Sequence, residues 1–317
     1  MENNTNSLLQ VEKLRQYFKV SKSYTVKAVD GVSFHINRGE TFGLVGESGS
    51  GKSTIGRTAI RLYDPTAGKI TFGGYDISGK LGRDAEKHLR TKMQMIFQDP
   101  MASLNPRKKV IDIVAQGLDV HHMYRDKAER KEKVYSILET VGLSDEHANR
   151  YPHQFSGGQR QRIGIARALV MNPELIIADE PITALDVSIQ AQVVNLLKEV
   201  QERTGIAYLF IAHDLSMVRY ISDRIGVLHQ GHLLEMGTTA EIFDMPVHPY
   251  TRSLLSAIPH PNPRVEKKRV AISYDRDALH IDYAKGALHG VGGTHTVLAT
   301  GDELDMWLEQ AQKPVSQ

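Results

Sequence analysis

Four residues between positions 46 and 53 have the types and spacing of a loop that binds phosphate groups. Gly46 is followed, after four other residues, by Gly51, Lys52 and Ser53, which is the order G-x-x-x-x-G-K-S/T. Glycines let the backbone turn so that several N–H groups converge on one anion. We expect Lys52 to reach the β- and γ-phosphates of ATP and the Ser53 hydroxyl to bind Mg²⁺. The predicted nucleotide contacts are Gly46, Glu47, Ser48, Gly49, Ser50, Gly51, Lys52, Ser53 and Thr54.

An acidic pair follows a short apolar run further along the chain. Residues 175–178 are apolar and precede Asp179 and Glu180. A buried strand here would bring Asp179 to the magnesium ion and Glu180 to the water that attacks the γ-phosphate. A carboxylate in that position accelerates water attack by a factor of roughly 10²–10⁴. The alternative, two solvated acids at a strand end, becomes the weaker interpretation beside a phosphate loop.

A second stretch has the features of an anion-binding site. Ser156, Gly157, Gly158 and Gln159 precede a run typical of a helix, so exposed backbone N–H groups and a hydroxyl would meet at a helix N-terminus. An ordinary capped helix is the alternative. Because one γ-phosphate needs only one such loop, we expect the second stretch to contact a nucleotide held by another subunit.

The elements that must position these residues alternate between strands and helices, which indicates a mainly parallel sheet. Apolar runs end at Gln98, at Asp179 and at His213, as expected for buried strands that deliver polar side chains to one edge. Two earlier strands, 8–18 and 25–36, suggest a separate antiparallel layer, and a hairpin is expected around Gln230 and Gly231. Residues 188–203 have the apolar spacing of an amphipathic helix.

Two regions differ from this pattern. Residues 101–158 are helical throughout in character, so we expect an all-helical subdomain inserted in the α/β domain. Residues 259–268 contain prolines and a basic run and are interpreted as a linker. Beyond them we expect a small C-terminal appendage, whose histidines, at positions 280, 289 and 295, lack metal-ligand spacing and are interpreted as surface residues.

Composition narrows the function classes. The chain has 317 residues, 41% hydrophobic and 24% charged, with a net charge of +2. This near-neutral balance argues against a protein that binds nucleic acid through phosphate attraction. The absence of cysteine excludes disulfides, thiol catalysis and Cys-ligated metals. With neither a signal peptide nor an apolar run long enough to span a bilayer, any membrane role is expected to depend on partners.

Taken together, these motifs resemble those of the ATP-binding cassette (ABC) transporter ATPases. The resemblance covers about residues 8–258 and follows the family's order: Walker A at 46–53, Q-loop Gln98, signature at 155–159, Walker B at 175–180, D-loop Ala184-Leu185-Asp186 and switch His213. Phe155 stands where leucine is usual, and Thr183 where serine is common. Neither departure removes a phosphate contact.

The resemblance implies an α/β P-loop NTPase fold, with a RecA-like core, an antiparallel β layer and a helical subdomain. It also implies a head-to-tail dimer in which Ser156–Gln159 close on the partner's ATP. Gln98 would sense the γ-phosphate and Mg²⁺, and His213 would hold the γ-phosphate. An aromatic ring upstream of the phosphate loop should stack on adenine. We assign this role to Tyr24, with Tyr17 and Phe18 as alternatives.

Residues 248–259 and 99–106 resemble the oligopeptide/dipeptide/nickel importer ATPases, most of all their F-type subunits. This implies a domain over 1–258, an extension over 259–317 and a place at the cytoplasmic face of the membrane. The implied partners are a homologous ATPase, two transmembrane permeases and, indirectly, an extracellular substrate-binding protein, with no nucleic acid. Residues 101–106 would dock a permease helix, unless they pack on the domain's own core. A dipeptide, nickel or other small-solute cargo stays open, as does a soluble non-transport ABC ATPase.

Overall fold

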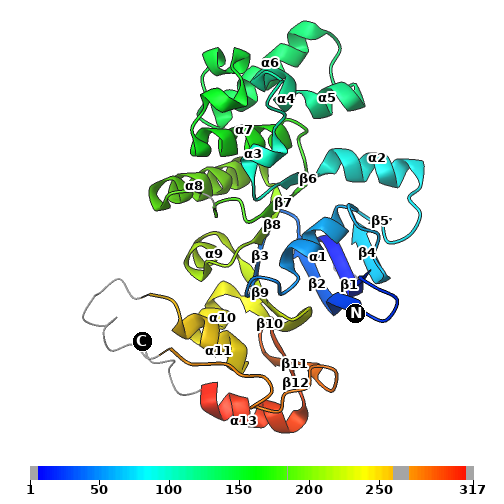
Figure 1. The fold of residues 1–317 in the computed structure, drawn as a ribbon, viewed down its shortest axis with the longest axis vertical. Helices are drawn as coiled ribbons and strands as arrows, with labels where there is room; N and C mark the ends of the chain where they lie inside the picture. The colour runs from blue at the N-terminus through cyan, green and yellow to red at the C-terminus, as the bar shows by residue number, and fades with distance from the viewer. Residues whose placement is uncertain (1–5, 184, 260–270, 312–317) are drawn as a thin grey trace.

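The structure is a computed structural model that describes residues 6–183, 185–259 and 271–311. Its strands form two sheets, one of four strands in the order β2-β1-β4-β5 and one of eight in the order β11-β12-β10-β9-β3-β8-β7-β6. Figure 1 shows a helical region above these sheets and the C-terminal segments below them. In the part of the chain described, no helix combines the length and the apolar character that crossing a bilayer requires.

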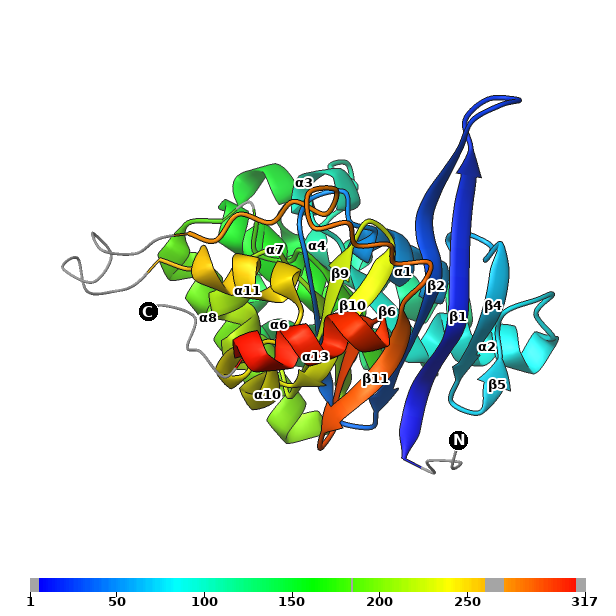
Figure 2. The same ribbon diagram turned by 90° about the horizontal axis from the view of Figure 1, so that it is seen from below.

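The four-stranded sheet is the expected antiparallel layer. β1 pairs with β2 on one side and with β4 on the other, and Figure 2 shows the long β1–β2 hairpin extending past the rest of the molecule. Its strands are β1 (Ser7–Lys19), β2 (Thr25–Asn37), β4 (Ala67–Phe72) and β5 (Tyr75–Asp76).

The eight-stranded sheet contains the expected parallel core. β6, β7, β8, β3 and β9 run parallel, and β9 turns back antiparallel into β10. Every residue of β3, β7 and β8 is buried, because helices or the second sheet cover both faces. The bounds are β3 (Thr41–Val45), β6 (Met93–Ile96), β7 (Leu175–Asp179), β8 (Ala207–Ile211), β9 (Arg224–His229) and β10 (His232–Thr238).

Successive residues of the core strands face two different apolar clusters. In β7, Ile176 and Ala178 belong to the cluster that includes Val193 and Leu197 of α8. Leu175 and Ile177 belong to the cluster that includes α1 and the four-stranded sheet. This period of two is that of a strand buried on both faces. The helices involved are α1 (Lys52–Ala59), α8 (Val187–Thr204) and α9 (Leu215–Ile221).

The segment between β6 and β7 is helical, as expected. Its interior is continuous with one of the two core clusters through residues such as Val134 and Leu138. Leu104 is also buried there, 3% exposed, so the apolar segment after Gln98 packs partly on the chain's own core. The elements are α2 (Arg83–Lys92), which precedes β6, then α3 (Pro100–Ser103), α4 (Val110–Val114), α5 (Gln116–His121), α6 (Lys127–Thr140), the 3-10 helices Asp145–Asn149 and Pro152–Gln154, and α7 (Gly157–Leu169).

The C-terminal segment is part of the central sheet, which differs from the expected appendage. β12 (His295–Ala299) pairs with β10 through Glu235–Val297 and Met236–Thr296, and with β11 (Ala287–Gly292). Pairing with β12 covers the backbone edge that β10 would otherwise expose. The remaining helices are α10 (Thr239–Asp244), α11 (Pro249–Ser256) and α13 (Gly301–Ala311). Nearly all of the expected linker, from residue 260 onward, lies outside the described residues.

The prediction of a surface position is wrong for one of the three C-terminal histidines. His295 is 1% exposed, and its Nε2 lies 2.7 Å from Oε1 of Glu235, a carboxylate with no exposed side-chain area. The residue is buried because β12 adds to the sheet beside β10, which carries Glu235. His280 is exposed and His289 is half-buried.

Candidate nucleotide-binding site

The loop between β3 and α1 has the backbone that its glycines predict. Gly46, Gly49 and Gly51 have φ values of 148°, 81° and 106°, a region that other residues avoid. A Cβ atom at Gly46 would lie 2.0 Å from the carbonyl oxygen of Leu228, and one at Gly51 would lie 2.3 Å from that of Ala28. The loop can therefore approach its neighbours this closely only with glycine at these positions.

Lys52 is held at the inside of this loop. Its Nζ donates to the carbonyl oxygens of Gly46 at 2.8 Å and Glu47 at 2.7 Å, and to Oγ of Ser50 at 3.4 Å. Burial lowers the pKa of the ammonium, while Glu180, Asp179 and Glu47 oppose that shift. A largely desolvated cation beside converging backbone N–H groups is a strong attractor for phosphate.

Ser53 and Asp179 meet at the end of β7. The Ser53 hydroxyl donates to Oδ1 of Asp179 at 2.6 Å, and Arg57 approaches Oδ2 at 3.3 Å. A hydroxyl and a carboxylate suit Mg²⁺, which uses few protein ligands and completes its shell with phosphate oxygens and water. No group of three or more His, Cys, Asp or Glu side chains suited to a metal occurs among the described residues. The donor set therefore fits a nucleotide-borne magnesium ion and not an all-protein metal site.

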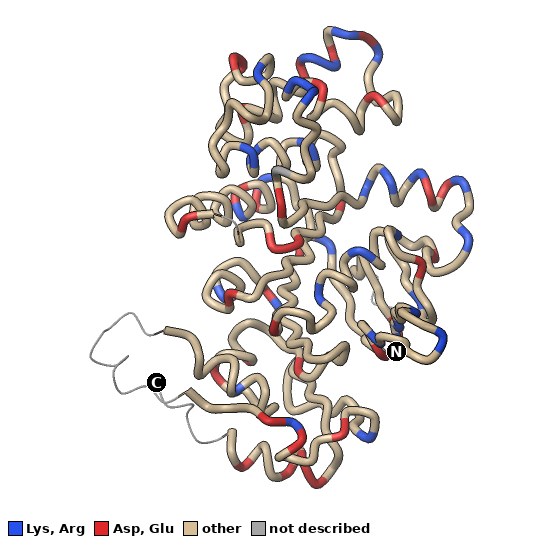
Figure 3. The backbone as a smooth tube through the Cα atoms, in the orientation of Figure 1, with Lys and Arg blue, Asp and Glu red and all other residues tan. Residues whose placement is uncertain are grey.

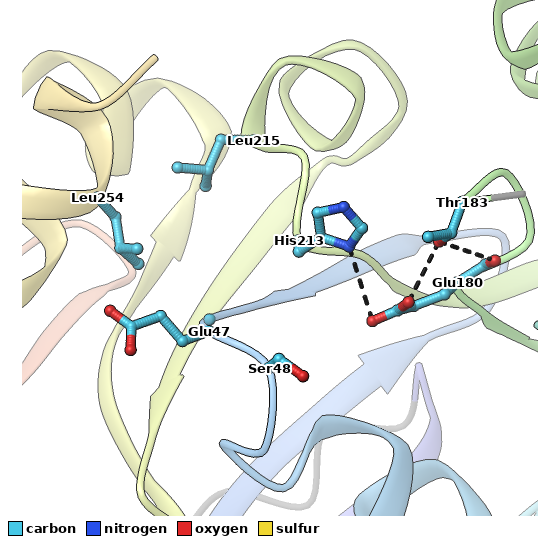
Figure 4. Close-up of a pocket in the computed structure, with 8 residues that line it drawn as sticks. Glu47, Ser48, Glu180, Thr183, His213, Leu215 and Leu254 are labelled. Carbon is cyan, nitrogen blue, oxygen red and sulfur yellow. Dashed lines mark hydrogen bonds and ion pairs between the residues drawn. The ribbon is translucent and has the colours of Figure 1, made fainter. Parts of the chain in front are cut away.

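Glu180 connects the predicted Q-loop and switch residues. Its side chain accepts hydrogen bonds from Nε2 of Gln98 at 2.7 Å and from Oγ1 of Thr183 at 3.2 Å. Nδ1 of His213 lies 3.7 Å from the other carboxylate oxygen. Figure 4 shows Glu180 and Thr183, from the loop after β7, facing His213, from the loop after β8, beside the phosphate loop.

Two cavities adjoin this cluster. One of about 480 Å³ is lined by Gly46, Glu47, Ser48, Glu180, Thr183, His213, Leu215 and Leu254. The other is lined by the phosphate loop together with Gln98, Glu180, Gln230 and residues 26–28 at the start of β2. Glu180 lines both cavities, so its carboxylate borders the space on either side of the phosphate loop.

The three candidate aromatic residues for adenine stacking differ in whether their side chains already have partners in the protein. The ring of Phe18 packs against that of Tyr63 with centroids 5.2 Å apart, and the Tyr17 hydroxyl donates to Asp30. Tyr24 is 60% exposed. It also lies directly before β2, two residues from Val26, which lines the loop cavity. Adenine stacking on Tyr24 stays a prediction that this geometry favours.

The predicted signature residues lie apart from the phosphate loop. Ser156 caps α7 by accepting from the Gln159 N–H, and Gln159 Oε1 accepts from the Ser156 N–H. Ser156 and Gly157 are exposed, as is Asp186 at the start of α8. None of the residues 156–159 lines either cavity beside the loop. The structure thus brings the loop, Gln98, Asp179, Glu180 and His213 together and leaves Ser156 and Gly157 of the signature exposed.

Sequence reasoning missed three residues that contact this site. Arg57 pairs with Asp179, and its position four residues after Ser53, one helical turn away, could have indicated it. Thr183 bonds to Glu180 but was noticed only as a departure from the family pattern. The Tyr250 hydroxyl accepts from the Glu47 N–H at 3.0 Å, and nothing near Tyr250 in the sequence points to this contact.

A phosphate loop between a buried strand and a helix, with an acidic pair at the end of a neighbouring strand, defines a P-loop nucleotide-binding protein. Sequence comparison narrows this class. Residues 29–183 match the family described as "ABC transporter". Residues 234–280 match the family described as "Oligopeptide/dipeptide transporter, C-terminal region".

Individual relatives agree with both matches. The oligopeptide transport ATP-binding protein OppF of Bacillus subtilis (strain 168) is 61% identical over 86% of this chain and 88% of its own. The protein of the same name from Streptococcus mutans is 55% identical over 96% of this chain and 98% of its own. The dimeric ATP-binding cassette MJ0796, solved with ADP and Pi, superposes with a TM-score of 0.66 at 29% identity, covering 73% of this chain and 98% of that one. The chain therefore belongs to the ABC transporter ATP-binding protein family.

Proposed function

We propose that this chain is the ATP-hydrolysing subunit that powers import of oligopeptides across the cytoplasmic membrane. The observation that carries the proposal is Glu180, held by Gln98 and near His213 at the edge of the phosphate loop. The match of residues 234–280 to the oligopeptide/dipeptide family supports the transport role. The names of the relatives described above favour oligopeptides over the other cargoes considered.

In the proposed reaction, the loop N–H groups and Lys52 bind the ATP phosphates and orient the γ-phosphate toward Glu180. Ser53, Gln98 and Asp179 would hold Mg²⁺, which neutralises phosphate charge when bound. Glu180 then orients the attacking water and accepts its proton. His213 would stabilise the negative charge on the departing γ-phosphate.

The proposed assembly has a homologous ATP-binding subunit as the second half of a heterodimer. Ser156–Gln159 and Asp186 would face the partner's ATP, since these residues are apart from the chain's own loop cavities. Two transmembrane permeases would hold the ATPases at the cytoplasmic face, with an extracellular binding protein delivering the peptide. In this proposal residues 1–258, with the helical subdomain at 101–158, are the ATPase domain, and 259–317 are the linker and extension.

The test is the substitution Glu180→Gln in the assembled transporter. The amide keeps the shape of the side chain but cannot accept a proton, so we expect normal ATP binding and turnover reduced by roughly 10²- to 10⁴-fold. Glu174→Gln is the matched control. It makes the same chemical change at the opposite end of β7 from Glu180. Near-normal ATP turnover in Glu180→Gln would reject Glu180 as the base.

A further inference from the structure

The helix α11 reaches the phosphate loop through one buried side chain. Tyr250 is 1% exposed, and its hydroxyl oxygen accepts a hydrogen bond from the Glu47 backbone N–H at 3.0 Å. This N–H belongs to the peptide unit that joins Gly46 to Glu47. Tyr250 therefore contacts the main chain of the loop itself.

The other end of the same peptide unit is bound by Lys52. Nζ of Lys52 donates to the Gly46 carbonyl oxygen at 2.8 Å. The C=O and N–H of a planar trans peptide point in opposite directions, so Lys52 and Tyr250 hold this unit from its two sides. Rotating the peptide would break both hydrogen bonds and move the lysine that faces the phosphates.

The position of α11 is fixed by a buried carboxylate in the sheet. Glu235 of β10 accepts from the backbone N–H groups of Val247 at 2.7 Å and His248 at 3.0 Å, directly before the helix. Oε1 of Glu235 also lies 2.7 Å from Nε2 of His295 on β12. Through Glu235, the hairpin of β11 and β12 is thereby connected to the start of α11, the helix that carries Tyr250.

Aromatic contacts fix the Tyr250 ring itself. Its centroid lies 4.3 Å from that of His229, whose Nδ1 is 2.6 Å from the Tyr283 hydroxyl. The Tyr283 hydroxyl is in turn 2.8 Å from that of Tyr274. A second contact links the same region to the loop cavity, because Arg276 donates at 2.9 Å to Gln230, a cavity-lining residue. Figure 1 shows these C-terminal segments next to β9 and β10.

We propose that Tyr250 is a positioning residue for nucleotide binding. Its hydroxyl orients the Gly46–Glu47 peptide. The C-terminal residues that support Tyr250, between 274 and 295, therefore contribute to nucleotide binding. This inference rests on the proposed function and adds to it a role for the segment that follows the ATPase core.

The test compares two buried Tyr→Phe substitutions in the full chain. Tyr250→Phe removes the acceptor and leaves the Glu47 N–H unpaired. Tyr208→Phe is the control, because Tyr208 is fully buried and its hydroxyl has no hydrogen-bond partner among the described residues. We expect Tyr250→Phe to weaken ATP binding by about 3- to 10-fold, the usual net effect of losing one hydrogen bond, and Tyr208→Phe to bind as the unmodified chain does.

Two further measurements separate positioning from a general loss of stability. In the assembled transporter, Tyr250→Phe should raise the KM for ATP and keep kcat within twofold. In the nucleotide-free chain, amide hydrogen exchange of residues 44–51 should be faster in Tyr250→Phe and unchanged in Tyr208→Phe. Unchanged ATP affinity and exchange in Tyr250→Phe, or equal effects in both variants, would overturn the inference. If the unmodified chain bound no ATP, the proposed function would fail, and loop exchange would still decide whether Tyr250 orients the Gly46–Glu47 peptide.

Discussion

At the level of single residues, Lys52 is the buried cation of the phosphate loop. It is 4% exposed, and its acceptors in the loop are two carbonyl oxygens and a hydroxyl. Such neutral acceptors stabilise a desolvated ammonium less well than an anion does, because only an anion adds the Coulomb attraction between opposite charges. Lys52 is therefore placed to gain free energy from a bound phosphate.

Lys52→Ala should accordingly remove most ATP affinity. Losing a buried, charge-assisted hydrogen-bond donor costs about 1.5–3 kcal/mol, which corresponds to roughly 10- to 100-fold weaker binding. An equilibrium titration with a fluorescent ATP analogue measures the change, with the exposed Lys69→Ala as the control. An unchanged dissociation constant for Lys52→Ala would show that the loop binds phosphate without its lysine.

At the level of elements, the start of α11 depends on a neutral histidine. His248 caps this helix, with its Nδ1 accepting the Tyr250 N–H at 3.0 Å. Burial lowers the pKa of His248 to about 3, and that of nearby His229 to about 4. Because the folded pKa lies below the unfolded value of about 6.5, the unfolded chain binds more protons in acid. Stability from these groups is complete above pH 6.5 and declines as the pH falls toward the folded pKa.

This argument predicts an acid-sensitive free energy of unfolding. Between pH 6.5 and pH 5, each such histidine should cost roughly 2 kcal/mol, from about 1.4 kcal/mol for each pH unit. His248→Asn keeps a capping oxygen but does not titrate, so urea unfolding at pH 7 and pH 5 should show a smaller acid loss in this variant. His280→Asn, at an exposed position, should keep the whole loss. Identical losses in His248→Asn and the unmodified chain would contradict the assignment.

The segment after Gln98 gives a second prediction at this scale. Ala102 of α3 is exposed, whereas Leu104 is 3% exposed and belongs to the core of the chain. Only the exposed side of this segment is open to a permease helix. Because the chain contains no cysteine, a single engineered thiol reports one position. Ala102→Cys should crosslink to a permease in the assembled transporter, and Leu104→Cys should not. Ala102→Cys that never reaches a permease would reject docking here.

At the level of the whole molecule, the proposed dimer is supported by the separation of residues 156–159 from the cavities beside the phosphate loop. The helical subdomain lies at one end of the molecule (Figure 1), and α7 begins at its C-terminal boundary, next to the exposed Ser156 and Gly157. Positions of Lys and Arg, like those of Asp and Glu, are distributed along the described backbone in both sheets and in the helical region (Figure 3). A second nucleotide, bound to a partner, would supply the anion for the N-terminus of α7.

Ser156→Arg should therefore damage the partner's site. A large cation at the helix start would replace the small hydroxyl and block the approach of the partner's γ-phosphate. When this variant is mixed with an unmodified homologous ATPase, vanadate trapping of nucleotide should fail on the partner's Walker A. Trapping on this chain's own loop should persist, because the partner's signature is intact. Loss confined to this chain's own loop would mean that the signature acts within one chain.

The sequence by itself determined the features whose physics is local. The glycines, Lys52 and Ser53 lie within one loop, so their spacing is enough to predict the positive φ angles that the structure has. Buried strands were recognisable from short apolar runs, and Asp179, Glu180 and His213 follow such runs directly. Because parallel strands present their carboxyl ends at one edge of a sheet, these residues could be expected to meet.

Tertiary structure alone decided how the C-terminal segment is used. Its short β-like runs suggested an appendage, but strand pairing depends on which backbone edge is free, and that edge belongs to β10. The contact between Tyr250 and Glu47 joins residues 203 positions apart. His295 is buried because β12 lies beside β10, which carries Glu235. Such contacts depend on how separate elements pack, and no local pattern of residue types records that packing.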